Sequence, residues 1–247
     1  MSARNYKKQL TFNQKELKDL VVSILTFSVI FFLFFIVSFW RNEEISTQIV
    51  LQKSIFLIVS VSIILFGLNL LIKQLSLSKG YTAEYSSWKT GLLSGGILSF
   101  LSYGFLPLVF FGTTEFSIIS RLRFGKIHQG ENKREIKNIL LMTYLFSFTI
   151  LIFLYMTSVV MNSTTLFYFS LMLSHILFCS LLPFKKSLGV LLFFSQQRKT
   201  DGLKVYFPFL IFSLLVSLAI GLNSFILVLL AIIITPLIWL MIKKIKK

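Results

Sequence analysis

The sequence predicts an all-α membrane protein with six transmembrane helices and a re-entrant hairpin or loop, in a single polytopic domain over residues 1–247. Composition is the first reason: 55% of the residues are hydrophobic and the mean hydropathy is +0.83, far outside the soluble range. The second reason is that several apolar runs reach the ~20 residues that a helix needs to cross the hydrocarbon core. A chain of 247 residues is too short for a membrane domain plus a sizeable soluble domain.

The formal net charge of +16 suggests nucleic-acid binding in a soluble chain, but orientation in a membrane chain. Of the 25 Lys and Arg residues, only Arg41 and Lys53 would face outward in the six-span topology. Orientation is therefore the better interpretation. We expect a multi-pass plasma-membrane protein with both termini in the cytoplasm, membrane lipids as partners and no nucleic acid.

Residues 1–19 are polar and basic, and we expect them to form a cytoplasmic or interfacial entry to the first span. Asn13 stands three residues before Glu16, as in a capping box, which predicts a helix start here. A segment resting on the bilayer surface and an ordinary solvated entry both stay open. A signal peptide is not expected, because the apolar run behind this lead could span a bilayer and no small-residue cleavage site follows.

The apolar runs predict six spans. They cover about 20–40, 54–72, 138–160, 165–184, 206–222 and 225–242. The last two come from one run of about 37 residues, too long for a single straight helix at ~1.5 Å per residue. The break is expected at Gly221-Leu222-Asn223-Ser224. The short apolar run Leu188–Phe194, in the preceding basic loop, is a candidate for dipping into the bilayer.

One more apolar segment, 91–112, is long enough to cross but is predicted to be re-entrant. If it crossed, the loop 113–137 would lie outside with its six Lys and Arg residues, against the positive-inside bias. The segment is also rich in glycine and contains Pro107, a composition that suits irregular backbone buried in protein at membrane depth.

Three stretches stand out by their order along the chain. They are Lys15-Glu16-Leu17-Lys18-Asp19-Leu20; then Gly80-Tyr81, Ala83-Glu84-Tyr85, Trp88 and Gly91-Leu92-Leu93; and last Leu181-Leu182-Pro183-Phe184 with Gly189 beyond. In this order and on this topology they resemble an archaeal-type branch of the site-2-protease family, the intramembrane zinc metalloproteases. They look like the entry to that family's first span, the stretch after its zinc helix and the approach to its Asp-Gly pair.

The resemblance implies a zinc site whose ligands this sequence lacks. In the family, two His of a His-Glu-x-x-His helix bind zinc, the Glu polarises the attacking water, and a distant Asp is the third ligand. Counted back from Gly80, this window falls on Leu68-Asn69-Leu70-Leu71-Ile72, and the Asp-Gly pair becomes Leu188-Gly189. Leu68, Asn69, Ile72 and Leu188 are thus degenerate zinc-site positions. Two further family motifs, Ala-Gly-Pro and Pro-Gly, are not matched near Asn138-Ile139-Leu140 and Pro107.

Aliphatic side chains cannot bind zinc and Asn cannot act as a general base, so we expect a pseudoprotease without metal or cofactor. Candidate groove or polar contacts are Asn69, His175, Cys179 and Ser180. Asn69 either hydrogen-bonds a neighbouring helix or is a remnant of a substrate groove. His175 and Cys179 share a helix face and either pack in the bundle or need further metal ligands, which no predicted span supplies. Ser180 is five residues from His175, which is poor geometry for a nucleophile and its base.

The resemblance implies recognition without cleavage. Proteases of this kind admit a transmembrane or extended segment between helices and an edge-like element. A member without zinc would bind membrane segments, or serve as a structural or regulatory subunit of a membrane complex, with other membrane proteins as partners. Two alternatives stay open. One is a small-solute transporter or channel, against which the shortage of ionisable residues in the spans argues; the other is a membrane protease with an unrecognised site.

Overall fold

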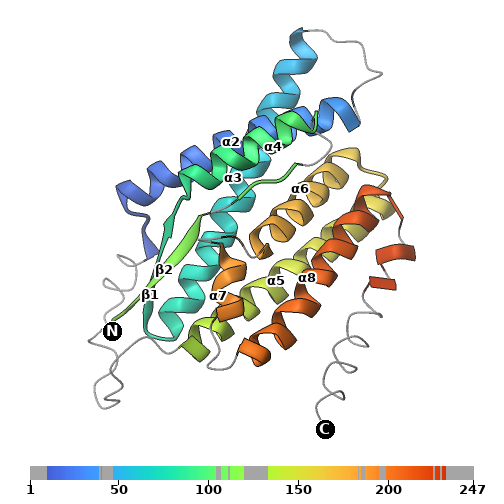
Figure 1. Ribbon diagram of the computed structural model, residues 1–247. Coiled ribbons are helices and arrows are strands. Elements are labelled where there is room, and N and C mark those ends of the chain that lie inside the picture. Colours follow the sequence, from blue (N-terminus) through green and yellow to red (C-terminus); the bar gives the residue numbers. More distant parts are fainter. Residues whose placement is uncertain are drawn as a thin grey trace. The chain divides into compact units, whose positions relative to one another are not determined.

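The computed structural model describes residues 10–38, 40, 47–103, 107–110, 112–119, 133–182, 184, 187–194, 199–224, 226–228 and 230–231. Its elements, labelled in Figure 1, are α2 (Gln14–Ser38), α3 (Thr47–Ser78), β1 (Tyr81–Ser86), α4 (Lys89–Leu101), β2 (Thr113–Ile118), α5 (Lys133–Val160), α6 (Thr164–Leu181), α7 (Leu188–Phe194) and α8 (Lys199–Gly221). The chain forms two compact units, Met1–Ile139 and Leu140–Lys247, and each is described by itself.

Helices dominate the described chain, and four of them are long and apolar enough to cross a membrane. They are Gln14–Ser38, Thr47–Ser78, Glu135–Val160 and Thr164–Leu181. These four helices contain the first four predicted spans to within three residues, which supports the predicted class of helical membrane protein. A shorter apolar helix, Tyr206–Gly221, covers the fifth predicted span. Most of the sixth, 225–242, lies outside the described residues, so the total of six spans stays a prediction.

Two helices end at an asparagine in the left-handed conformation. After α5, Asn162 has φ 51°, and Ser163 then caps α6 by accepting a bond from the Leu166 amide at 3.4 Å. After α8, Asn223 has φ 49° and the Ser224 amide donates to the Ala219 carbonyl at 3.0 Å. Asparagine tolerates this conformation better than most residues and so ends helices well. The predicted break at 221–224 is confirmed.

The first unit also contains a small two-stranded antiparallel sheet, which the sequence did not predict within the otherwise helical fold. Tyr81 of β1 lies opposite Ile118 of β2, and Ser86 lies opposite Thr113. In β1 the side chains of Tyr81, Ala83 and Tyr85 are buried, whereas those between them are more exposed. This two-residue alternation is the sequence signal of a half-buried strand.

The predicted re-entrant segment 91–112 follows a hairpin path. Because Ser86 and Thr113 are paired, the chain leaves the sheet along α4 and returns to the point where it left. The returning segment packs closely on α4: the Ser99 hydroxyl donates to the Leu108 carbonyl at 3.2 Å, and a Cβ on Gly95 would lie 2.7 Å from that oxygen. The expected irregular backbone is wrong for α4, which is a regular helix in which Gly91 and Gly95 allow close packing. Its place in a bilayer stays a prediction.

In the second unit α6 and α7 pack against α8, and α7 also packs against α6. The Tyr206 hydroxyl of α8 donates to the Leu181 carbonyl at the end of α6, at 2.6 Å. Phe148 of α5 and Phe212 of α8 meet edge to face with ring centroids 4.9 Å apart. The apolar core side chains of this unit include Leu151, Leu171, Met172, Ile176, Leu177 and Val216.

Candidate functional site

The window that the resemblance compares with a zinc helix lies in the C-terminal half of α3. Asn69 and Ile72 are buried, and Leu68 is half-buried. The side-chain amide of Asn69 donates to the Leu65 carbonyl one turn earlier, at 2.9 Å. This bond of Asn69 is therefore made within its own helix, rather than to the neighbouring helix that the sequence suggested.

Leu188 is half-buried and is the first residue of α7, in the second unit. The glycine after it has a packing role. A Cβ built on Gly189 would lie 2.1 Å from the Leu181 carbonyl oxygen, so a larger residue would displace α7 from the end of α6. Leu188 and the α3 window belong to different units, and each is described in its own.

His175, Cys179 and Ser180 all lie on α6. His175 Nδ1 donates to the Leu171 carbonyl at 2.9 Å, and the Cys179 side chain is buried. The Ser180 hydroxyl donates to the Leu177 carbonyl at 2.8 Å, which leaves it to accept from the Tyr144 hydroxyl, also at 2.8 Å. Within the described ranges, no three His, Cys, Asp or Glu side chains gather in a way that could hold a metal ion.

Sequence reasoning missed a buried ion pair in the first unit. Glu16 Oε2 of α2 accepts from Lys73 Nζ of α3 at 2.6 Å, and the two side chains are 3% and 5% exposed. Lys73 Nζ also donates to the Thr11 carbonyl at 3.3 Å and lies 4.4 Å from the centroid of the Phe12 ring. The Asn13 amide donates to Glu16 Oε2 at 3.3 Å, which confirms the predicted capping-box contact.

The same acidic turn of α2 holds the outer edge of β1. Glu16 Oε1 accepts from the Tyr85 amide at 3.0 Å, and Asp19 Oδ2 accepts from the Ser87 amide at 3.1 Å. These amides point away from β2, because neighbouring residues of a strand bond in opposite directions. Two carboxylates therefore occupy the edge at which a further strand could pair with β1.

The Tyr85 side chain fixes the far end of the sheet. Its hydroxyl bonds the Ser23 hydroxyl of α2 at 2.8 Å and accepts from the Gly112 amide just before β2. Burial raises the pKa of Tyr85 to about 12, because the phenolate would lose its hydration. Gly112 allows this approach: a Cβ there would lie 1.8 Å from the Ser86 carbonyl oxygen.

The outer edge of β2 differs from that of β1. The register makes the backbone N–H and C=O groups of Thr114, Phe116 and Ile118 point away from β1. None of the residues that the structure describes bonds to these groups. The Thr114 hydroxyl is also buried without a hydrogen-bond partner there. A short row of peptide groups at this edge thus lacks a partner within the described residues, and two of the three residues that carry it, Thr114 and Phe116, are buried.

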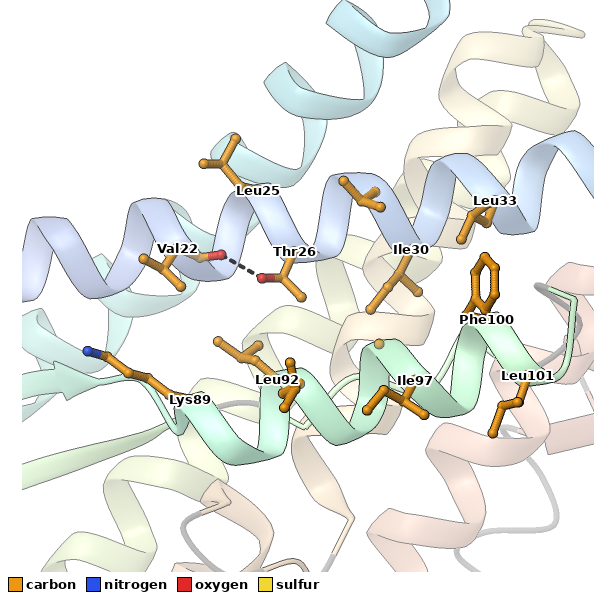
Figure 2. A pocket seen from close by; sticks show the side chains of 13 residues that line it. Val22, Leu25, Thr26, Ile30, Leu33, Lys89, Leu92, Ile97, Phe100 and Leu101 are labelled. Carbon is orange, nitrogen blue, oxygen red and sulfur yellow. Dashed lines mark hydrogen bonds between the residues drawn. The ribbon is translucent and has the colours of Figure 1, made fainter.

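A groove of about 750 Å³ runs between α2 and α4. Figure 2 shows the two helices side by side, with Lys89 and Val22 at one end and Leu33, Phe100 and Leu101 at the other. The Thr26 hydroxyl is turned back to the Val22 carbonyl of its own helix, at 2.9 Å. The lining between the two ends is therefore apolar. The sequence carried a signal for this face, since Val22, Thr26 and Val29 recur at helical spacing on α2.

Comparison with known proteins gives no family: no protein-family model, no curated protein and no solved structure matches this chain.

Proposed function

We propose that this chain is a non-catalytic, site-2-protease-like membrane protein that binds an extended segment of another membrane protein along the outer edge of β2. The observation that carries the proposal is the contrast between the two edges of the sheet. Carboxylates of Glu16 and Asp19 occupy the β1 edge, whereas the outward peptide groups of β2 have no partner among the described residues. A guest strand would satisfy them, as in other cases of strand addition.

The side chains at the compared positions support the proposal of a protein without catalytic activity. Leu68, Ile72 and Leu188 are aliphatic, and the Asn69 amide cannot take a proton from water. His175 and Ser180 have backbone and Tyr144 partners, which suits roles in packing. Binding without cleavage is therefore the activity that these residues favour.

A photo-crosslinking pair tests the binding edge. A benzophenone amino acid is placed at Ser117 of β2 or at Thr82 of β1, which lie opposite each other in the sheet register. Adducts with a membrane protein are expected from position 117 and not from position 82, and peptide mapping should place them in an extended segment of that protein. Equal adducts from the two positions, or none from position 117, would contradict the proposal.

A proline variant tests whether backbone pairing is responsible. Thr114→Pro removes one outward N–H, whereas Thr114→Val keeps that N–H and removes only the unpartnered hydroxyl. The proposal predicts that proline reduces the adducts from position 117 and that valine does not. Metal content is measured on the same sample. Stoichiometric zinc, with proteolysis abolished by His175→Ala or Cys179→Ala, would replace this proposal with a protease that uses an unrecognised site.

A further inference from the structure

The groove between α2 and α4 presents apolar side chains to its surroundings although it belongs to a compact unit. Val29 of α2 is 62% exposed, and Phe100 of α4 is 70% exposed. The groove lining includes Gly96, where an added Cβ would meet no atom within 4 Å. A ligand that fills this space must be long, narrow and apolar, since Thr26 offers its hydroxyl to its own helix.

The length of the groove matches one leaflet of a bilayer. It extends along α2 from Val22 to Leu33, which is roughly 16 Å at the rise of an α-helix. Half of a hydrocarbon core of ~30 Å is the length available to one lipid acyl chain. A transmembrane helix of a partner would need the full thickness, so the dimension favours an acyl chain.

Among the described residues that line the groove, a charged side chain occurs at one end only. Lys89 lines that end, and Lys18 lies one helical turn before Val22 on the same face of α2. Both lysines are exposed, and neither forms an ion pair with a carboxylate among the described residues. The nearby Asp19 carboxylate accepts from the Ser87 amide. The opposite end, at Phe100 and Leu101, is apolar.

The start of α4 adds to the positive potential at the charged end. Its N-cap residue, Trp88, provides no side-chain cap, so amide groups of the first turn keep their hydrogen-bonding capacity. The N-terminus of a helix attracts anions, and here it coincides with Lys89, the first residue of α4. One end thus suits a phosphate, and the rest suits a hydrocarbon tail.

We propose that the groove between α2 and α4 binds one acyl chain of an anionic phospholipid, with the lipid phosphate held by Lys18 and Lys89. This site is separate from the strand edge of the proposed function, so either can fail without the other. The proposal requires that binding depend on the headgroup charge and on the open space at Gly96, and it is tested through both.

The test is native mass spectrometry of the purified full chain, released from detergent that contains equimolar phosphatidylglycerol and phosphatidylcholine. One retained phosphatidylglycerol per chain is expected. Gly96→Leu should abolish its retention by filling the groove. The matched control is Gly67→Leu on α3, where an added Cβ also meets no atom within 4 Å, and it should retain the lipid. Losses in both variants, or in neither, would overturn the proposal.

The same mass-spectrometric measurement tests the contribution of the two lysine charges. Lys18→Gln and Lys89→Gln should each weaken retention about fivefold, the effect of one lysine near an anionic lipid surface. Lys79→Gln removes an exposed lysine of the turn before β1 and should change nothing. Equal retention of the two lipids by the wild type would show unselective solvation of an apolar surface. A bound polypeptide that Gly96→Leu displaces would show a protein occupant, and either result would overturn the proposal.

Discussion

The two strands of the small sheet have the same length but are held very differently. β1 is fastened to α2 by two carboxylates, one of which is itself neutralised by the buried Lys73 ammonium group. β2 has only β1 as a strand partner in the described part of the chain. Buried charged groups therefore hold β1 in place and occupy its outer edge. The outer edge of β2 has no such groups among the described residues. Four measurements can break or sharpen this contrast.

The largest effect is expected from Glu16→Ala. This change leaves the Lys73 ammonium buried without its partner and frees the Tyr85 amide. We expect the free energy of unfolding to fall by about 3–5 kcal/mol, as for other broken buried pairs. Chemical denaturation in detergent micelles measures it. The double variant Glu16→Leu/Lys73→Met should recover much of the loss, and a loss below ~1 kcal/mol in Glu16→Ala would show that the pair does not anchor β1.

The next effect is a loss of stability at high pH through Tyr85, whose pKa burial raises to about 12. The folded protein then holds a proton that the unfolded chain has released above its ordinary pKa of about 10. Stability should therefore be fully present below pH 10 and fall between pH 10 and 12, by about 2–3 kcal/mol in total. Unfolding curves across this range measure the fall. Tyr85→Phe should show a correspondingly smaller fall, and identical slopes for the two proteins would refute the prediction.

A smaller effect is expected from Asp19→Ala, which removes the acceptor of the Ser87 amide at the end of the outer edge of β1. Asp19 is only half-buried, so the free energy of unfolding should drop by about 1 kcal/mol. Hydrogen exchange gives a local measurement. The Ser87 amide should exchange faster in the variant while the Tyr85 amide keeps its rate, because Glu16 still accepts from it. If both amides exchanged faster, the contacts that Glu16 and Asp19 make with β1 would not be independent of each other.

The smallest effect on folding is expected at the open edge. Thr114→Pro removes an N–H that has no partner within the described residues, so the loss of stability should stay below ~1 kcal/mol. Glu115→Pro, at the next residue, removes an N–H that faces β1 and should cost about 1–3 kcal/mol. Thermal unfolding of the two variants compares them directly. Similar losses would mean that the outward groups of β2 are engaged.

The parts of the fold that the sequence predicted well are those set by local composition. The helices α2, α3, α5 and α6 follow from apolar length, and the break after Gly221 follows from turn residues. The sheet was missed because each strand is only six residues long and its partner lies across the α4 hairpin. Short strands are specified by a pairing that no single stretch of sequence displays.

The end of α3 shows why distant contacts limit such predictions. The predicted span 54–72 stops before Lys73, since an isolated lysine at membrane depth is costly. In the structure α3 continues to Ser78, and that lysine is buried in an ion pair with Glu16. The two residues are 57 positions apart. The candidate site could not be predicted for the same reason. The strand edge and the groove form only when α2 packs against β1 and α4, which are distant in the sequence.

The pairing of Ser86 with Thr113 also limits how many times the chain between these two residues can cross a membrane. The chain between these residues begins and ends at one point, so it can contribute only an even number of crossings. The end of α3 and the beginning of α5 must then lie on the same side of any bilayer, and the contact between Tyr81 and Glu135, at 2.8 Å, ties the first turn of α5 to that side. One inter-strand pairing thereby fixes the side of a bilayer on which α5 begins relative to the end of α3.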